Sequence, residues 1–146
     1  MSATADHAEE RTNPAARLGF EPGQVVQEIG YDDDVEQELR EGIESVIGQD
    51  LVDEDYDDVA DVVLLWFRED DGDLTDALVD AIGLIDEGAP VWLLTPKTGR
   101  DGYVEPSDIN EAAQTAGLSQ TKSINAGKDW TGSRLVTPKA AKSGKR

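Results

Sequence analysis

The sequence predicts a small α/β domain built on an open, mostly parallel sheet, with helices on both faces and an antiparallel hairpin at its C-terminal end. Short apolar runs alternate with segments of helical periodicity, in the order β-α-β-loop-β-α-β-α-β-β, and this alternation is typical of a parallel sheet. The runs at 62–67 and 91–94 are apolar throughout, as in strands covered on both faces. A turn-rich segment at 127–132 separates the last two extended stretches, which indicates a hairpin rather than another crossover.

The length of the chain and the composition of its two ends predict the domain organisation. A chain of 146 residues is expected to form one domain with a sizeable core, and we place this domain at residues 17–137. Residues 1–16 are polar and lack periodicity, which predicts a disordered arm. Residues 138–146 carry four basic side chains and are predicted to form a disordered basic tail.

The first strand is predicted at residues 24–29, and a glycine and three aspartates follow it. The next segment has apolar residues spaced by 4, 4, 3 and 1 positions, which places them on one helical face: Val35, Leu39, Ile43, Val46 and Ile47. We expect Asp32 or Asp33 to cap the N-terminus of this helix, where the helix dipole favours carboxylates. Gly48 is expected to end the helix in the left-handed conformation.

The middle of the chain contains the strongest strand signal. Residues 51–52 predict only a short strand, and the charged run at 53–58 predicts a loop. Residues 62–67 are then predicted to form a central strand, with a loop at 68–72 after its carboxyl end. Asp73 is expected to cap the next helix.

The second half of the chain continues the same alternation. The helix after Asp73 has a clean apolar stripe and is predicted to run to Gly88. A buried strand at 91–95 leads into a loop at 96–103 that contains two glycines and two cations. A third helix is expected to begin at residue 105 or 107 and to end at residue 116, before a glycine.

The charge of the chain is unevenly distributed and restricts the classes of partner. The net charge is −19, and residues 28–88 hold 23 acidic side chains against only Arg40 and Arg68. Affinity for phosphate backbones needs a basic face, so we expect no direct nucleic-acid binding by this acidic body. The acid excess fits simple solubility, a proteome-wide bias, or a basic protein partner.

The composition also bears on compartment and covalent chemistry. The chain has no cysteine, so neither a disulfide nor a zinc–thiolate site is possible. No apolar run approaches the roughly 20 residues of a membrane span, and residues 1–14 lack the apolar region of a signal peptide. We therefore expect a cytoplasmic protein that makes no membrane contact.

Several segments of the chain resemble the Rossmann-like fold of S-adenosylmethionine-dependent methyltransferases, in a reduced, three-layer form. Residues 25–30 are similar to the strand, acidic residue and glycine of that family's first motif. Residues 60–65 are similar to its strand that begins with aspartate, and 84–94 to a helix end, glycine turn and following strand. Residues 116–118 are similar to the turn before its closing strands. The resemblance is topological and implies the fold rather than an activity.

This resemblance also implies a cofactor site, from which the sequence departs. The residues that would hold S-adenosylmethionine are Glu28, Gly30, Asp53 and Asp55. The family continues past its first glycine with small residues, but here Tyr31 and three aspartates follow. A tyrosine side chain would fill the space for the amino-acid end of this cofactor. A dinucleotide site is not expected either, because no second glycine of a G-x-G-x-x-G motif follows Gly30 and the three carboxylates would repel a phosphate. We therefore expect no cofactor, with S-adenosylmethionine as the alternative.

A longer resemblance is to a small family of uncharacterised actinobacterial proteins, described as a domain of unknown function. The segments that carry it are residues 18–34 and residues 128–136. This resemblance implies an actinobacterial cytoplasmic protein with a methyltransferase-like fold. It implies no activity.

The candidate contact residues lie where strands are predicted to end, because ligands of open α/β sheets bind at the carboxyl ends of the strands. For a protein partner, we select nine residues: Tyr31, Asp32, Asp33, Asp34, Arg68, Lys97, Arg100, Trp130 and Arg134. For each there is a structural alternative. The aspartates could cap the helix, Trp130 could cover a sheet edge, and the cations of the 96–103 loop could neutralise the aspartate turn.

Neither a metal site nor a catalytic centre is predicted. The three aspartates lack the spacing of a calcium-binding loop, although hard cations do take several carboxylate oxygens. His7 is the only histidine and lies in the N-terminal arm, so no Ser-His-Asp or Cys-His arrangement can form.

Three functional hypotheses follow from these observations. The first is a non-catalytic module that binds or regulates another protein through the strand-end edge. The second is a reduced S-adenosylmethionine-dependent methyltransferase. The third is an acidic decoy that occupies a basic nucleic-acid-binding protein, whose binding would collapse between low and moderate salt.

Overall fold

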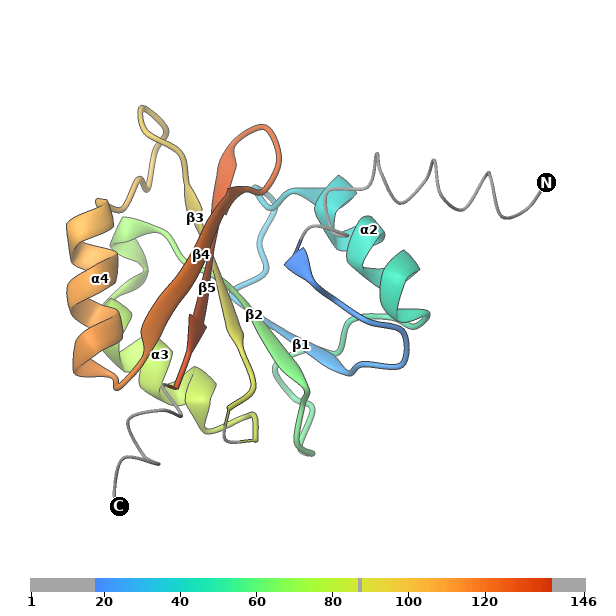
Figure 1. Cartoon of the computed structure of the whole chain (residues 1–146). Coiled ribbons are helices and arrows are strands. Elements are labelled where there is room, and N and C mark those ends of the chain that lie inside the picture. The colour runs from blue at the N-terminus through green and yellow to red at the C-terminus, as the bar shows by residue number, and fades with distance from the viewer. Residues whose placement is uncertain (1–17, 87, 138–146) are drawn as a thin grey trace, which may run out of the picture.

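The sheet has the predicted mixed topology. A computed structural model describes residues 18–86 and 88–137, so the predicted arm and tail lie outside the described residues. The five strands are β1 (Val26–Ile29), β2 (Val62–Trp66), β3 (Val91–Pro96), β4 (Ser119–Asn125) and β5 (Trp130–Val136). Their order in the sheet is β1-β2-β3-β5-β4, with parallel pairs from β1 to β3 and antiparallel pairs on both sides of β5 (Figure 1). Only β5 runs against the other four strands, which confirms the predicted closing hairpin.

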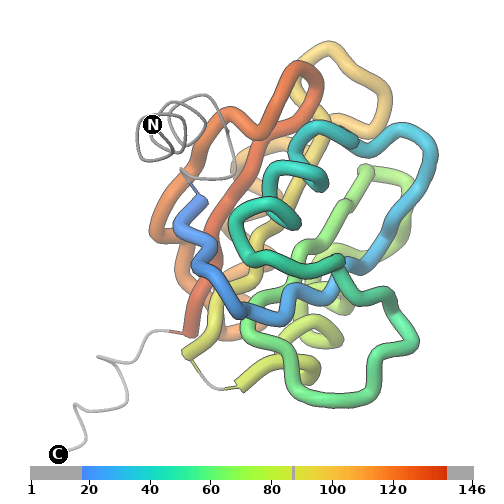
Figure 2. The backbone as a smooth tube through the Cα atoms, turned by 90° about the vertical axis from the view of Figure 1, so that its right-hand side faces the viewer, coloured from blue at the N-terminus to red at the C-terminus, as the bar shows by residue number. Residues whose placement is uncertain are grey.

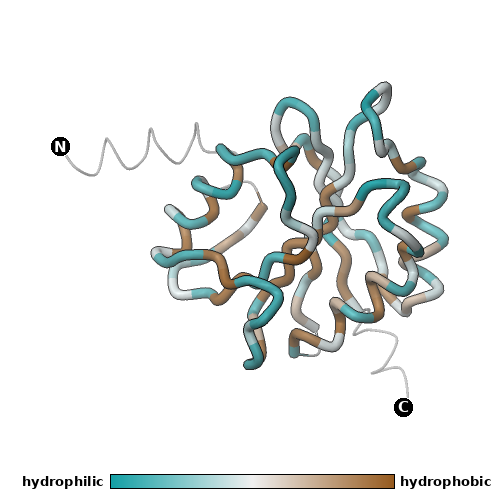
Figure 3. The backbone as a smooth tube through the Cα atoms, turned by 180° about the vertical axis from the view of Figure 1, so that it is seen from behind, coloured by the Kyte–Doolittle hydropathy of each residue, from teal (hydrophilic) through white to brown (hydrophobic). Residues whose placement is uncertain are grey.

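Three helices cover the two faces of this sheet. The helix α2 (Gln37–Ile47) lies on one face, and α3 (Leu74–Ile82) and α4 (Pro106–Thr115) lie on the other (Figure 1). Viewed from its own side, α2 crosses in front of the strands (Figure 2). The apolar segments gather in the strands, and the turns at the periphery are mostly hydrophilic (Figure 3).

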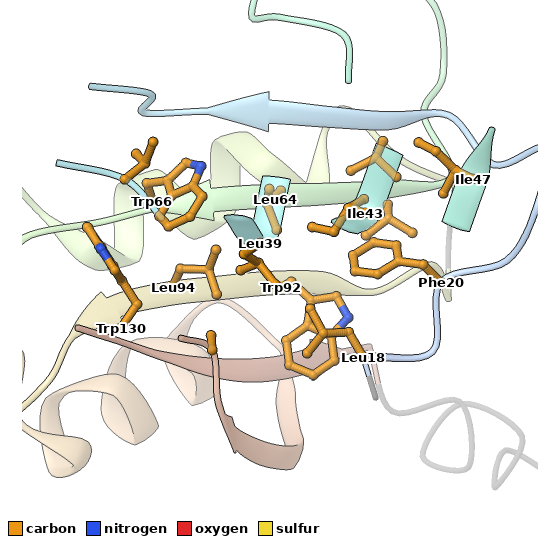
Figure 4. Close-up of a cluster of buried hydrophobic side chains, with 14 residues drawn as sticks. Leu18, Phe20, Leu39, Ile43, Ile47, Leu64, Trp66, Trp92, Leu94 and Trp130 are labelled. Carbon is orange, nitrogen blue, oxygen red and sulfur yellow. The ribbon is translucent and has the colours of Figure 1, made fainter. Parts of the chain in front are cut away.

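Two apolar cores result from the alternation of side chains along each strand. In β2, Val62, Leu64 and Trp66 face α2, whereas Val63 and Leu65 face α3 and α4. The core under α2 contains all three tryptophans of the chain, together with Leu18 and Phe20 from the segment before β1 (Figure 4). Every residue of β2 and β3 is buried, as expected for strands covered on both faces.

The start of α2 differs from the prediction. The helix begins at Gln37 with Glu36 as its N-cap, and no side chain caps it. The prediction that Asp32 or Asp33 caps this helix is therefore wrong. Those residues belong to a turn in which the Asp32 carboxylate accepts the Asp33 backbone N–H at 2.7 Å. At its other end, the helix closes at Gly48 with φ of +81°, as predicted.

The end of α3 also differs from the prediction. Asp73 caps the helix as expected, accepting the backbone N–H of Asp76 at 3.2 Å. The helix ends at Ile82 rather than at Gly88, because the chain returns to the sheet early and Ile85 forms a parallel bridge with Ala60. Within 18–86 and 88–137, no helix is long and apolar enough to cross a membrane.

Candidate functional site

The buried carboxylate of Glu28 lies at the carboxyl end of β1, where the resemblance implied a cofactor residue. Its side chain is only 6% exposed. Arg40 of α2 donates to it through Nε at 2.6 Å and Nη2 at 2.9 Å, and the Trp66 indole N–H donates at 2.8 Å. Hydrogen bonding to Glu28 is the main cause that raises the pKa of Arg40. Both oxygens of Glu28 are therefore bound by groups of the chain itself.

Gly30, which follows β1, makes a close backbone approach. Its φ is +84°, and a Cβ atom at this position would lie 2.3 Å from the carbonyl oxygen of Trp66. Only glycine fits there, since side-chain-bearing residues rarely adopt this φ. The Gly30 N–H donates to the carboxylate of Glu54 at 2.9 Å. The glycine is thus required by packing against β2, and its donor is already used.

Tyr31 lies on the surface beside this carboxylate. Its side chain is 51% exposed, with the Arg40 guanidinium 4.7 Å from the ring centroid, and the Gln37 amide donates to its hydroxyl at 3.0 Å. A cavity of about 420 Å³ opens next to it, lined by Glu28, Tyr31, Arg40, Asp53, Glu54 and Asp55. The structure therefore brings the predicted cofactor residues of β1 and of the 53–58 loop around one cavity.

Arg68 joins three segments at the end of β2. Its guanidinium pairs with Asp34 at 2.5 Å and with Asp71 at 3.2 Å, and donates to the carbonyl of Gly30 at 2.8 Å. Hydrogen bonding to Arg68 lowers the pKa of Asp34. Arg68 is only 9% exposed, so this predicted contact residue lies in the wall of the site and not on its surface.

Trp130 lies at the start of β5 and is 2% exposed. Its indole N–H donates to the backbone carbonyl of Asp34 at 3.0 Å. The ring stands edge-to-face to Trp66, with centroids 4.9 Å apart, and the Arg68 guanidinium lies 5.2 Å from its centroid. The tryptophan predicted as a contact residue therefore anchors the turn before α2 to the hairpin.

The loop after β3 faces the turn between β4 and β5. The side chains of Arg100 and Asp129 form an ion pair at 3.3 Å, and the backbone N–H of Lys97 donates to the carbonyl of Asp129 at 2.9 Å. Arg100 therefore pairs with the hairpin turn and not with the aspartates after Gly30. A cavity of about 490 Å³ lies here, lined by Asp34, Pro96, Gly99, Arg100, Asp101, Asp129 and Trp130.

The fold places the predicted contact residues Asp32 and Asp33 far from Arg134. Asp32 and Asp33 are exposed beside Tyr31, as a contact surface requires. Arg134 lies within β5, opposite Trp92 in β3, and donates to the hydroxyl of Thr121 at 3.1 Å. It is therefore part of the sheet, away from the strand-end edge. Among the described residues, no group of three or more His, Asp or Glu side chains is arranged to hold a metal ion.

Sequence reasoning missed Arg40 as a functional residue. One signal could have found it, because Arg40 and Arg68 are the only bases among 23 acids in residues 28–88. A carboxylate as deeply buried as that of Glu28 must be paired, and these two arginines are its only basic candidates nearby in sequence. The role of Glu54 had no such signal, since several equivalent acids surround it.

Comparison with known sequences gives close relatives. Residues 15–139 match a family described as a protein of unknown function (DUF3052). Uncharacterised proteins of Mycobacterium bovis and of Mycobacterium tuberculosis are each 51% identical over 142 residues, which span 97% of this chain and 87% of each relative. These matches confirm the resemblance carried by residues 18–34 and 128–136.

Comparison with solved structures gives distant neighbours of one kind. A SAM-dependent methyltransferase from Aquifex aeolicus superposes with a TM-score of 0.51 at 13% identity, over 88% of this chain and 92% of that one. The magnesium protoporphyrin IX methyltransferase of Synechocystis PCC 6803 gives 0.52 at 13% identity, over 93% and 82%. An O-methyltransferase family 2 protein from Planctomyces limnophilus gives 0.58 at 12% identity, over 86% and 56%. At such identities the likeness shows the fold alone, and it confirms the predicted methyltransferase-like α/β architecture.

Proposed function

Since the chain belongs to this family of proteins of unknown function (DUF3052), we propose its role from the site itself: it is a non-catalytic module that binds a basic protein through the exposed carboxyl edge of its sheet. One observation carries this proposal. In the structurally similar methyltransferases, a cofactor would need the groups that correspond to the Glu28 carboxylate and the Gly30 N–H. Here both groups are bound by the chain's own side chains, while the acidic residues around them are exposed.

The fit of S-adenosylmethionine can be judged from the residues that line its expected place. Glu28 has both oxygens engaged by Arg40 and Trp66, and the Gly30 N–H is taken by Glu54. A cofactor would have to break these bonds and leave buried charges unpaired, which is costly. This arrangement supports the view that the turn after β1 does not bind S-adenosylmethionine.

The exposed surface next to this turn supports protein binding. Tyr31 is half exposed among Asp32, Asp33 and the acids of the 53–58 loop. Tyrosine is enriched at the centres of interfaces, and a uniformly negative field attracts a positively charged partner and speeds its association. The complementary partner is a protein with a basic face.

This proposal is tested by quantitative cross-linking in an actinobacterial extract. The tagged full chain is compared with the triple variant Tyr31→Ala, Asp32→Asn, Asp33→Asn and with a control, Glu38→Gln, Glu41→Gln, Val79→Ala, in which Val79 of α3 is as exposed as Tyr31. The proposal predicts one or more basic proteins that cross-link to the wild type and the control, are lost with the triple variant and are weakened by salt. Equal cross-linking of the triple variant would contradict the surface assignment.

A second candidate is the reduced methyltransferase, and the cavity beside Glu28 favours it. Its volume of about 420 Å³ lies within the range of small-molecule sites, roughly 300–1,000 Å³. The measurement that separates the two candidates is transfer of a labelled methyl group from S-adenosylmethionine to any component of a cell extract. Transfer that requires Glu28 would establish the enzyme, whereas the first candidate predicts none.

A further inference from the structure

A second cavity at the same sheet edge has a different lining from the one over β1. It is the cavity of about 490 Å³ between the loop after β3, the hairpin turn before β5 and the segment that precedes α2. We call it the hairpin cavity. It shares no lining residue with the cavity beside Glu28, so it lies outside the place where the neighbouring fold implies a cofactor.

The hairpin cavity has an excess of negative charge. Asp34, Asp101 and Asp129 line it, and Arg100 is the one cation in its lining. The Arg100–Asp129 pair is loose, at 3.3 Å with side chains 56% and 35% exposed. Asp101 is exposed and has no hydrogen bond or ion pair within the described part of the chain. A positively charged ligand would therefore find at least one free carboxylate and a second that is weakly held.

The chain itself shows which cation such surroundings bind. Arg40 lies between the Glu28 carboxylate and the ring of Tyr31. Arg68 lies between the Asp34 carboxylate and the ring of Trp130. In both places a guanidinium donates to both oxygens of one carboxylate and lies against an aromatic ring. This combination suits arginine better than lysine.

The hairpin cavity offers a carboxylate in a more accessible form. Asp129 lines the cavity and is 35% exposed, whereas Trp130 is 2% exposed and forms part of the wall, with its ring in contact with Arg68 and Trp66. Arg100 already pairs with Asp129, from a loop in which Gly99 and Gly102 have φ of +87° and +85°. The side chain of Arg100 thus occupies the place of an external cation without being buried there.

We propose that the hairpin cavity binds an arginine side chain from a basic segment of a partner protein, with Asp129 as its main carboxylate and Arg100 displaced. This inference rests on the proposed function, because it names the side chain through which the basic partner docks. It also predicts that Arg100 competes with the ligand, which a purely structural ion pair would not do.

The test uses a defined probe and the full chain. The probe is the peptide acetyl-Gly-Gly-Arg-Gly-Gly-amide, and its matched control carries neutral citrulline in place of arginine. Binding is followed by NMR on ¹⁵N-labelled protein, through the Trp130 indole signal and the backbone amides of Arg100 and Asp129. We expect saturable shifts at these three groups with the arginine peptide and none with the citrulline peptide.

Variants sharpen the result. Asp129→Asn is expected to weaken binding by about tenfold, because it removes a charge-assisted hydrogen bond. Arg100→Ala is expected to tighten binding by about threefold, since the competing side chain is gone. Glu41→Gln, an exposed residue of α2, removes the same charge as Asp129→Asn and is expected to change nothing. Both cavity residues are at least one-third exposed, so these variants should fold, and amide spectra verify it.

Two outcomes would overturn the inference. One is binding that shifts residues all over the acidic surface to a similar extent, and the other is no response at Trp130 and Asp129 up to millimolar peptide. Either result would leave the proposed function standing if cross-linking still depends on Tyr31 and its neighbouring aspartates. Loss of that dependence with a positive peptide titration would instead reject the surface around Tyr31 and keep the hairpin cavity.

Discussion

The two cavities at the carboxyl edge of the sheet contain the same residue types in different states. Over β1, the Glu28 carboxylate is 6% exposed and is bound by Arg40 at 2.6 Å. In the hairpin cavity, Asp129 is 35% exposed and its pair with Arg100 measures 3.3 Å. One acid is fixed within the fold, and the other remains accessible to solvent and to ligands.

The difference comes from the elements that supply the counter-charge. Arg40 extends from a helix whose other face packs into the core, and Arg68 lies two residues after the end of the buried strand β2, next to the buried Phe67. Arg100 comes from a loop between glycines. A counter-ion on a rigid element neutralises its carboxylate permanently, whereas one on a loop can be replaced. Acidity alone therefore does not identify the contact surface of this chain.

The largest loss of stability is expected from a substitution at Gly30, next to the cavity over β1. Gly30→Ala should lower the free energy of unfolding by about 4 kcal/mol, through the φ of +84° and the clash with the Trp66 carbonyl. At about 2–4 °C per kcal/mol, the melting temperature should fall by about 10 °C. Gly48→Ala is the matched control, with φ of +81° and no atom within 4 Å of the new Cβ. It should cost only about 1 kcal/mol, and equal losses would show that Gly30 makes no close approach.

The next effect concerns the buried ion pair. Arg40→Met leaves the Glu28 carboxylate buried without its cation and should cost about 3 kcal/mol in urea unfolding. Adding Glu28→Gln to this variant should recover part of the loss, because the buried charge is removed. Arg134→Met is the control, since the side chain of Arg134 has only the Thr121 hydroxyl as a hydrogen-bond partner in the described structure. A loss no larger for Arg40→Met than for this control would contradict the closed site.

A smaller, pH-dependent effect belongs to the pair between Asp34 and Arg68. Arg68 lowers the folded-state pKa of Asp34 below 3.8, so the pair stabilises the protein above that pH and is lost as pH falls through the lowered pKa. Since Asp34 is 54% exposed, solvent screening limits its contribution to about 1 kcal/mol at pH 7. The difference in unfolding free energy between wild type and Asp34→Asn should thus shrink from pH 5 to pH 2. A constant difference would exclude this linkage.

The smallest effect is expected at the open side. Arg100→Ala should change the free energy of unfolding by less than about 0.5 kcal/mol, because exposed ion pairs contribute little. Thermal unfolding at low and high salt measures this directly. A loss above about 1.5 kcal/mol would show that Arg100 is as firmly built into the fold as Arg40, and the contrast between the two cavities would disappear.

Much of the fold could be predicted from the sequence, because apolar periodicity records which face of each element is buried. The run at 62–67 gave an inner strand of the sheet, β2, and the turn-rich segment at 127–132 gave the closing hairpin. The turn was predicted too long, since Trp130, Thr131 and Gly132 belong to β5. The ends of helices were less predictable. Asp32 and Asp33 had the residue type of an N-cap, but the segment that contains them is held by the pair between Asp34 and Arg68. The Gly88 signal was overridden by the bridge between Ala60 and Ile85.

The candidate site could be predicted only in its location. The edge followed from where parallel strands end. Which acids are engaged there depends on contacts between segments far apart in sequence, such as Trp130 with Asp34, 96 residues earlier. Tryptophan and arginine are residue types common at contact surfaces, yet Trp130 and Arg68 are both buried. No local pattern distinguishes these two states, because the partner that buries each residue comes from another element.

Glu28 and Gly30, the groups that would hold a cofactor at the end of β1, are engaged by the chain's own side chains, and calorimetric titration with S-adenosylhomocysteine tests this. The wild type and the variant Glu54→Ala, which removes the acceptor of the Gly30 N–H, are titrated with ligand up to about 1 mM, the range that detects even weak affinity. The wild type should give no binding heat. Micromolar binding that disappears with Glu28→Gln would contradict this expectation and would establish a cofactor site at the end of β1.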